Sequence, residues 1–579
     1  AKCVVGNGAA HCGALSSAMP VEAEGIWEVV LGTSNGGVPV TQGEDPSSAS
    51  SGRLGNGSFV QQLAPPSGSR HILGRRLHFA KLSGAGPETG WVTTSLKEKD
   101  FVARNYDVEA NDLKPRVNEA PPPAVPADGR RPFDVIIYGA SGFTGTLSME
   151  HLDAVLASRG GAGGGCRWAI AGRSAARLRP LAARCKTGPA VVQASGPEEI
   201  SKLAASCRVL LVAAGPYQRC GEEVIKACVE QGTHYVDVTG EVPWVREMIA
   251  KYHDAARKKG VMVVHCAGQI CTIDDLSLYL LAQKLGPLKQ FREYFASSGD
   301  MTGGTYDTNI ATFKDMTQDR LQVMRDPFSL GGKRRGGVRP EDADCSESLQ
   351  DTLFPSLWLQ PAYSTPTGSR ILRRSCQLFE EAPGDRLLYG EALTVTIRDC
   401  SFSQQAAKKQ IAMTAPPPDA ETAKVMASAM MANVAGGGGP KPGQGPPPET
   451  RQMYYSDVYA VAEGENGSWA HVHYTGPEAY EATAMSCVTA ALTLAEEGER
   501  LQPASRGGVL TPAFAMHGSS FVERLQAVSF GNGGGRRMTF EVRAGKPSED
   551  EVKEVAKAKM KSAASTQADI MGGKLKAYT

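Results

Sequence analysis

Residues 132–275 alternate between short apolar runs and longer amphipathic stretches. The first apolar run, Phe133–Tyr138, is rich in β-branched and aromatic residues, which is typical of a strand buried on both faces. Five similar runs follow, separated by helical sequence, at 167–171, 190–193, 209–213, 234–238 and 261–265. Because strands that alternate with helices form βαβ units, this part of the chain is predicted to be a doubly wound, Rossmann-type parallel sheet in an α/β fold.

A glycine-rich turn follows the first predicted strand directly, and helical sequence begins near Thr146. In such a turn one glycine allows the tight bend, one lets a pyrophosphate approach the backbone, and one permits close helix packing. The amides and the dipole at a helix start favour a phosphate there. This context predicts a dinucleotide site made of Gly139, Ala140, Ser141, Gly142, Phe143, Thr144 and Gly145.

The second predicted strand ends in the sequence Gly172-Arg173-Ser174. An acidic residue near this point binds the ribose of NAD, whereas an arginine accommodates the 2′-phosphate of NADP. Arg173 has no acidic neighbour, so Arg173 and Ser174 predict NADP(H) as the cofactor.

Ligands of doubly wound sheets bind outside the carboxyl ends of the strands. The loops there are expected to bring these residues to the cofactor: Gly215, Pro216, Tyr217, Asp237 and Thr239. Tyr217 could donate a proton through its phenol and Glu241 could shuttle one, so these two are the candidate catalytic residues. The structural alternatives stay open: Tyr217 stacks on the nicotinamide, Asp237 caps a loop, and His265 is a core histidine.

Composition divides the rest of the chain into further segments. They are an extended or disordered N-terminus (1–23), a β module that resembles SH3-like barrels (24–103), a proline-rich linker (104–131), an α/β substrate or dimerisation domain (276–543) with a Gly/Pro loop at 436–448, and a charged C-terminal helix and tail (544–579). Late sequence at 480–497 and 511–525 could return to the Rossmann part. The last helix begins with a capping box, Ser548 and Glu551, and its apolar face is thin. We therefore expect it to project from the body or to dock on a partner protein.

The charge balance excludes some classes of function. The 579 residues include 62 Lys plus Arg and 61 Asp plus Glu, a formal net charge of +1, which argues against nucleic-acid binding through a broad basic face. Apolar runs such as 209–214 are far shorter than the ~18 residues of a spanning helix, so no transmembrane segment is expected. The apolar stretch 353–359 either contacts a lipid surface or faces the core.

The thirteen cysteines contain no CxxC pair, which predicts reduced thiols. His471 and His473 alternate along a strand without a third ligand nearby, so no metal site is expected. Residues 1–21 carry no acidic side chain and the sequence starts without methionine. We read this as a processed organellar precursor, with a plastid favoured over a mitochondrion and a cytoplasmic or lipid-surface location as the alternatives.

Motifs recur in a fixed order along the chain, at 134–145, 172–174, 215–217 with Gly221, 227–241, 303–305, 326–328, 373–375, 480–484 and 508–513. Together they resemble the saccharopine dehydrogenase-like oxidoreductases, which include the trans-acting enoyl reductases. The resemblance covers about residues 132–540 and implies a Rossmann domain followed by an α/β domain that covers the nicotinamide. In the enoyl-reductase branch it implies hydride transfer from NADPH to a conjugated double bond of a lipid precursor.

The sequence departs from this family at 268–275, where the family usually carries a Gly-Phe-Asp-Ser-Ile-Pro-type turn ending in Asp. Gly268 and Asp275 are kept, but Ile270 replaces the first carboxylate and Ile273 the proline. The phosphate cradle is thus intact, whereas the expected substrate-side loop is altered.

Two functions follow from these observations. The first is an NADP(H)-dependent oxidoreductase that reduces a small or lipid-derived C=C or C=N substrate. The alternative is a catalytically weak or inactive Rossmann protein that serves as an accessory subunit of a larger assembly. Its N-terminal module and C-terminal helix would then bind protein partners.

Overall fold

The computed structural model describes residues 26–29, 38–42, 47–54, 58–62, 76–83, 86–87, 89–93, 95–96, 99–100, 102–105, 130–160, 165–297, 299–332, 337–344, 347–382, 389–390, 393–414, 417–498, 500–501, 507–532, 535–571 and 578. The expected N-terminal segment 1–23 and most of the linker 104–131 lie outside the described residues. The chain divides into two compact units, Ala1–Asn118 and Glu119–Thr579, which are described separately.

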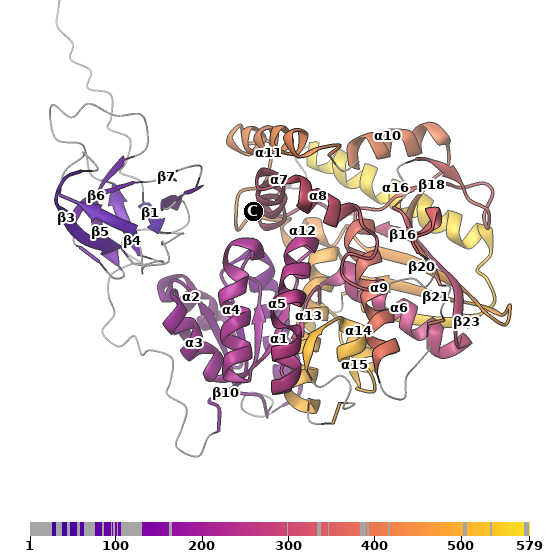
Figure 1. Ribbon diagram of the computed structural model, residues 1–579, viewed down its shortest axis with the longest axis horizontal. Helices are drawn as coiled ribbons and strands as arrows, with labels where there is room; N and C mark the ends of the chain where they lie inside the picture. Colours follow the sequence, from indigo (N-terminus) through magenta and orange to yellow (C-terminus); the bar gives the residue numbers. More distant parts are fainter. Residues whose placement is uncertain are drawn as a thin grey trace, which may run out of the picture. The chain divides into compact units, whose positions relative to one another are not determined.

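The first unit contains a seven-stranded antiparallel sheet with the strand order β3-β2-β6-β5-β4-β1-β9. Figure 1 labels β1, β3, β4, β5 and β6 of this sheet. Its strands are β1 (Ile26–Val29), β2 (Val38–Thr41), β3 (Ser50–Leu54), β4 (Phe59–Gln62), β5 (Arg76–Ser83), β6 (Thr89–Thr93) and β9 (Val102–Asn105), and β7 (Ser95–Leu96) pairs with β8 (Lys99–Asp100). Val40, Phe79 and Val92 are fully buried in its small core. The likeness to SH3 modules stays a prediction, and β9 runs past the boundary expected at residue 103.

The second unit contains the predicted parallel sheet, so the doubly wound α/β fold is confirmed. Its strands, in spatial order, are β12 (Ala190–Gln193), β11 (Trp168–Gly172), β10 (Phe133–Tyr138), β13 (Cys207–Val212), β14 (His234–Asp237), β15 (Met262–Val264) and β22 (Gly508–Leu510). The first six run in the 3-2-1-4-5-6 order of dinucleotide-binding sheets. The seventh comes from far along the chain and pairs in parallel with β15.

Helices cover both faces of this sheet, which explains why its strands are continuously apolar. Along β10, Val135 and Ile137 point into one core cluster, and Ile136 and Tyr138 into the other. The helices are α1 (Phe143–Ser158), α2 (Ala175–Arg184), α3 (Pro197–Ala205), α4 (Tyr217–Gln231), α5 (Val242–Lys259), α6 (Gln269–Leu285) and α13 (Ala479–Glu497). Helices α3, α4 and α5 pack in the cluster of Ile136 and Tyr138, while α1, α6 and α13 pack in the other.

A second seven-stranded sheet, mostly antiparallel, follows in the order β17-β18-β19-β16-β20-β21-β23. Its strands are β16 (Leu288–Ser297), β17 (Leu349–Gln350), β18 (Trp358–Pro361), β19 (Thr394–Ser401), β20 (Ser456–Gly464), β21 (Trp469–Gly476) and β23 (Thr539–Ala544), and only β16 and β19 pair in parallel. The accompanying helices are α7 (Gly303–Lys314), α8 (Gln318–Arg325), α9 (Thr365–Glu381), α10 (Gln404–Thr414), α11 (Ala420–Ala435), α12 (Pro448–Arg451), α14 (Pro512–Ala515), α15 (Phe521–Ala527) and α16 (Glu549–Met571).

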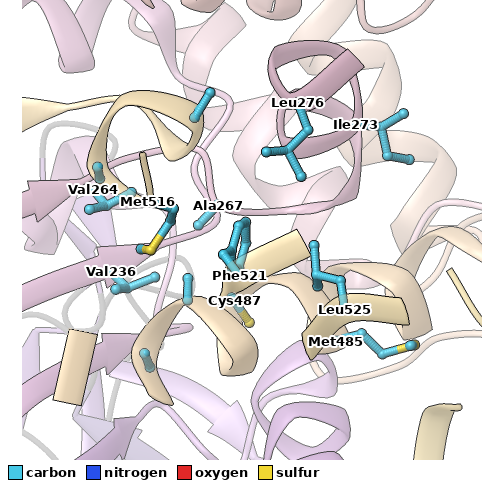
Figure 2. Close-up of a cluster of buried hydrophobic side chains, with 14 of the residues drawn as sticks. Val236, Val264, Ala267, Ile273, Leu276, Met485, Cys487, Met516, Phe521 and Leu525 are labelled. Carbon is cyan, nitrogen blue, oxygen red and sulfur yellow. The ribbon is translucent and has the colours of Figure 1, made fainter. Parts of the chain in front are cut away.

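The two sheets of this unit share one hydrophobic core, which passes through α6 and α13. Figure 2 shows the part of it in which β14 and β15 meet these two helices. Val236 and Val264 of the parallel sheet, Met485 of α13 and Phe291 of the second sheet all belong to it. The boundary expected at residue 275 therefore falls inside α6. The late segments do return to the Rossmann part, since α13 packs on α1 and β22 extends the parallel sheet.

The structure answers two questions about the surface. Helix α16 does not project from the body: Val552 is 2% exposed and packs with Tyr294 and Tyr459 of the second sheet. The capping box is present, because Ser548 and Glu551 exchange hydrogen bonds. The stretch 353–359 faces the same cluster, where Leu357 is fully buried, as the core-facing alternative expects.

Among the described residues, no helix combines the length and the apolar character needed to cross a membrane. The ten cysteines in the described part of the chain are free thiols.

His151 of α1 provides a test of the core. Its imidazole is fully buried, stacks on Phe530 at 5.8 Å, and neither ring nitrogen has a hydrogen-bond partner among the described residues. Burial lowers the pKa of His151 from 6.5 to about 4. The unfolded chain therefore binds a proton between these pH values that the folded chain does not, so stability falls as pH falls through this window.

We expect His151→Leu to remove this contribution. The unfolding free energy of the variant relative to wild type should rise by up to about 3 kcal/mol between pH 7 and pH 4, measured by chemical denaturation followed through tryptophan fluorescence. A difference that stays constant across this range would contradict the assignment.

Candidate cofactor-binding and active site

The glycine-rich turn between β10 and α1 is built around contacts that only glycine allows. Gly139 has φ +87°, and an ideal Cβ on it would lie 2.9 Å from the carbonyl carbon of Ala213. A Cβ on Gly145 would lie 2.2 Å from the carbonyl oxygen of Gly139. Thr146 closes the turn, because its hydroxyl donates to the carbonyl of Ala140 at 3.0 Å. The close packing of turn, strand and helix thus follows from the sequence.

Gly142 differs from the other two glycines. An ideal Cβ on it comes no closer than 3.4 Å to the protein, which is an ordinary contact. It precedes α1 in an extended conformation, and α1, whose residues are all described, has neither a side-chain cap nor an acidic residue in its first turn. The first amides of a helix need acceptors, and the positive end of its dipole favours an anion. The residues present therefore fit a pyrophosphate.

Arg173 and Ser174 follow β11 at the same edge. Ser174 is the N-cap of α2 and accepts a hydrogen bond from the amide of Arg177 at 3.4 Å, so its hydroxyl serves the fold. Burial raises the pKa of Tyr138, and the nearby Arg173 guanidinium opposes the rise. Arg173 thus lies beside the end of β10, at the edge where an adenosine ribose binds in such folds.

The side chains of the two candidate catalytic residues, Tyr217 and Glu241, form hydrogen bonds to backbone groups. The Tyr217 phenol donates to the carbonyl of Val212 at 2.9 Å, accepts from the amide of Val238 at 3.4 Å, and its side chain is 5% exposed. The Glu241 carboxylate accepts from the backbone amides of Tyr217 and Gln218, both at 2.8 Å. Both side chains are thus bound to backbone groups of nearby loops, and their catalytic roles stay predictions.

Asp237 and Thr239 also turn inward. The fully buried Asp237 carboxylate accepts hydrogen bonds from the Tyr235 hydroxyl, the amide of Thr239 and the amide of Cys266, and it lies 2.7 Å from His265 Nδ1. Thr239 accepts from the amide of Glu241 at 3.1 Å. Asp237 thus caps a loop and His265 is a core histidine, which were the structural alternatives. In the loops 213–216 and 238–241, Gly215 and Gly240 are exposed.

Three threonines that sequence reasoning missed reach the edge from other elements. Thr308 Oγ1 of α7 lies 3.6 Å from where a Cβ on Gly215 would stand. Thr367 of α9 donates to the carbonyl of Gly240 at 3.2 Å, and Thr483 of α13 accepts from the amide of Gln269 at 3.1 Å. Only Thr483 lies in a motif, 480–484, that carried the family resemblance; the other two gave no sequence signal.

The segment expected to be an altered substrate-side loop is the first part of α6. Asp275 is fully buried, where Ser375 donates to it at 2.5 Å and the amide of Ala513 at 2.8 Å, and burial raises its pKa to about 7. Asp274 faces Glu293 of β16, and burial raises the pKa of both carboxyls. These carboxyls join α6 to its neighbours, and the altered positions Ile270 and Ile273 lie in this helix rather than in a loop.

The Gly/Pro loop 436–448 contacts the phosphate turn. Gly445 is buried against the ring of Phe143, which a Cβ on Gly445 would approach to 2.4 Å. Gln444 accepts from the amide of Gly303, the first residue of α7, at 2.8 Å. Tyr480 packs edge-on against Phe143 and bonds to the Thr305 hydroxyl of α7 at 2.6 Å. The phosphate turn and α7 are thereby held by the same segments.

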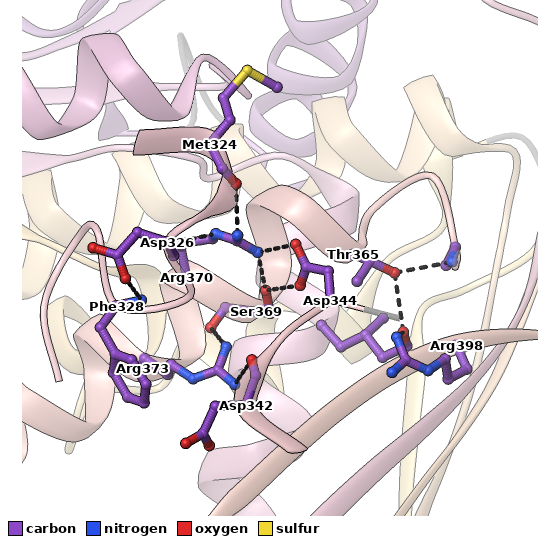
Figure 3. Close-up of polar contacts among 12 residues, drawn as sticks. Met324, Asp326, Phe328, Asp342, Asp344, Thr365, Ser369, Arg370, Arg373 and Arg398 are labelled. Atoms are coloured by element: carbon purple, nitrogen blue, oxygen red, sulfur yellow. Dashed lines mark hydrogen bonds and ion pairs between the residues drawn. The ribbon is translucent and has the colours of Figure 1, made fainter. Parts of the chain in front are cut away.

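The arginines of α9 are used within the fold (Figure 3). Arg370 is fully buried and binds Met324, Asp326 and Asp344, while Arg373 binds the carbonyl of Asp342 and stacks on Phe328. Arg374 donates to the carbonyl of Val509 in β22 at 3.1 Å. Motifs 326–328, 373–375 and 508–513 therefore meet in the fold.

No group of three or more potential metal ligands occurs within the described residues. His473 lies 2.7 Å from Asp457, and His471 contacts the carbonyl of Gly545 at 2.8 Å.

Comparisons with known proteins agree with this geometry. The family profile of the saccharopine dehydrogenase NADP binding domain matches residues 135–264. A Mycobacterium tuberculosis protein provisionally named a trans-acting enoyl reductase is 31% identical over 420 residues, covering 69% of this chain and 96% of its own length. The trans-acting enoyl reductase of Mycobacterium bovis is 30% identical over 443 residues, covering 68% and 96%.

Among solved structures, apo saccharopine dehydrogenase from Saccharomyces cerevisiae aligns with a TM-score of 0.39 and 14% identity, covering 71% of this chain and 99% of that one.

The glycines of the phosphate turn make a matched pair of variants. Gly145→Ala should lower the unfolding free energy by more than about 2 kcal/mol, because its methyl group overlaps the Gly139 carbonyl. Gly142→Ala should cost less than about 1 kcal/mol, since the space is open and only the N-cap changes. The same Gly142 variant should lose nicotinamide dinucleotide binding, measured by titration calorimetry. Normal binding by Gly142→Ala would show that the pyrophosphate does not lie there.

Proposed function

The chain belongs to the saccharopine dehydrogenase-like family that includes the trans-acting enoyl reductases, and on this premise we propose that it is an NADP(H)-dependent oxidoreductase. Its substrate would carry a C=C or C=N bond and be small or lipid-derived. The observation that carries the proposal is the intact phosphate turn, in which Gly142 leaves space at the uncapped start of α1.

Arg173 supports NADP(H) over NAD(H). It follows β11, beside the position that the ribose 2′-oxygen occupies in dinucleotide-binding folds. A guanidinium there forms charge-assisted bonds with a 2′-phosphate.

The bound nicotinamide would supply the hydride, and the chain would position it and exclude water. Two glycines, Gly215 and Gly240, lie at this edge of the sheet and have no side chain to exclude a nicotinamide. Thr308 lies beside Gly215, and Thr367 donates a hydrogen bond to Gly240. Helices α7 and α9, which carry these threonines, would cover the substrate. Hydride transfer needs chiefly this positioning and a polarising or proton-donating group.

The chemistry of this edge favours a neutral substrate. The side chains that approach Gly215 and Gly240 end in hydroxyl groups. Arg370, Arg373 and Arg374 are bound to protein oxygens, so they are not available for the carboxylates of an amino-acid substrate. An enoyl substrate, as in the names of the mycobacterial relatives, is therefore favoured over an amino-acid-derived imine.

The accessory-subunit alternative stays open. Val552 and Ala556 of α16 pack on the second sheet, whereas Glu551, Glu554 and Lys557 on the same helix are exposed. The N-terminal unit is the other candidate for binding a protein partner.

Cofactor choice tests the proposal. We expect wild type to bind NADPH more tightly than NADH, and Arg173→Ala to weaken NADPH binding at least about tenfold while changing NADH binding little. Titration calorimetry with both cofactors measures this, and Arg177→Ala, one turn away on α2, is the matched control. Equal affinity of wild type for the two cofactors would refute NADP(H) specificity.

Turnover is tested separately, by NADPH oxidation with enoyl-thioester and imine substrates. Reduction of an enoyl substrate is expected. Tight NADPH binding without turnover of either class, together with migration of the native protein in a large complex, would instead support the accessory role.

A further inference from the structure

Glu241 joins two loops at the carboxyl edge of the parallel sheet. It follows β14, but its carboxylate accepts the first two amides of α4, those of Tyr217 and Gln218, at 2.8 Å each. The side chain is 4% exposed. A buried carboxylate with two amide donors is a strong, directional anchor, because each bond is charge-assisted. The N-terminus of α4 is therefore capped by a side chain from another loop, that of Glu241 after β14.

The anchored turn lies at the proposed nicotinamide edge. Gly215 and Pro216 come directly before the two amides, and Gly215 stands beside Thr308 of α7. The position of Gly215 is thus set by where Glu241 holds the following residues.

Gln218 extends this anchor to the cover of the site. Its side-chain amide donates to Asp315 at 3.2 Å, where α7 ends, and its oxygen accepts from Arg320 of α8 at 3.1 Å. Arg320 in turn lies 3.4 Å from Glu247 of α5. The backbone amide of Gln218 donates to Glu241, and its side chain binds the corner between α7 and α8. Gln218 therefore connects the loop after β14 with the α7–α8 corner.

Charges around Glu241 have opposing effects on its protonation. Burial raises its pKa to about 7, the two amide bonds lower it, Asp237 raises it and Arg219 lowers it. The titratable groups next to it on α4 are Tyr217 and Cys220, whose pKa values burial raises. Asp315, Arg320 and Glu247 face it only through Gln218. A protonated carboxyl group has an oxygen that donates, so it loses one of its two acceptor sites.

We infer that Glu241 is a positioning residue: its carboxylate holds residues 215–218, and through Gln218 the α7–α8 corner, in the arrangement that receives the nicotinamide. This inference rests on the proposed NADP(H) function. It differs from a proton-shuttling role, because a carboxylate with both oxygens bonded to amides does not reach a substrate. Cofactor affinity should consequently fall when Glu241 takes up a proton.

The experiment compares wild type, Glu241→Gln and Glu222→Gln between pH 6 and pH 8.5. Glu222 is the matched control, because it lies on α4 but contacts Lys251 and Tyr252 at the surface. NADPH dissociation constants are measured by cofactor fluorescence. The 2′-phosphate itself titrates near pH 6, so the quantity compared is the ratio of variant to wild-type constants, in which this titration cancels.

At pH 8.5 Glu241→Gln should bind NADPH about tenfold more weakly than wild type, because it keeps only one acceptor oxygen. The ratio should shrink towards pH 6, where wild type is protonated too. Glu222→Gln should follow wild type throughout. A ratio near one at every pH, or a ratio that does not change with pH, would overturn the inference.

A second measurement does not depend on the cofactor. Hydrogen exchange of the peptide that contains the Tyr217 and Gln218 amides should be faster in Glu241→Gln than in wild type at pH 8.5. In wild type the protection should decrease below pH 7 after correction for intrinsic exchange. Unchanged protection would reject the anchor itself. Absence of NADPH binding to wild type, with the exchange effect present, would reject the proposed function and leave the anchor established.

Discussion

Two buried carboxylates, Asp237 and Glu241, control the edge of the parallel sheet. Removing a carboxylate from water is costly unless donors surround it, so each one gathers backbone amides from neighbouring loops. Asp237 binds the amide of Cys266, which has φ 58°, a left-handed conformation that is uncommon outside glycine. Glu241 binds the start of α4. The loops after β13, β14 and β15 thus hold fixed positions relative to one another before any ligand arrives.

Helix α6 connects this edge to the second sheet. It carries Asp275 to Ser375 on α9 and Asp274 to Glu293 on β16, and its apolar side chains belong to the core that both sheets share. Burial raises the pKa of each of these carboxyls, and the nearby Glu293 carboxyl raises that of Asp274 further. Packing against both sheets constrains the sequence of α6. We therefore attribute the differences from the family at 268–275 to packing.

A feature of this structure could be predicted from the sequence when it depends on residues that are close together in the chain. The parallel strands and the turn from Gly139 to Gly145 were predictable, because apolar runs and glycine spacing act over a few residues. The role of Glu241 was not, since its partners are more than twenty positions away and a carboxyl group near a cofactor has the same sequence signature in either role. The placement of α16 was not predictable for a related reason. Its apolar face is narrow, yet Val552 and Ala556 pack against the aromatic rings of β16 and β20, which are far away in the sequence.

The hydrogen bonds of the buried side chains at this edge also restrict where a proton for reduction could come from. Tyr217 gives its hydrogen to the carbonyl of Val212, and His265 is 1% exposed beside Asp237. The groups that do approach Gly215 and Gly240 are the hydroxyls of Thr308 and Thr367, which relay a proton but do not supply one. If the chain reduces a substrate at this edge, the proton would then have to come from water.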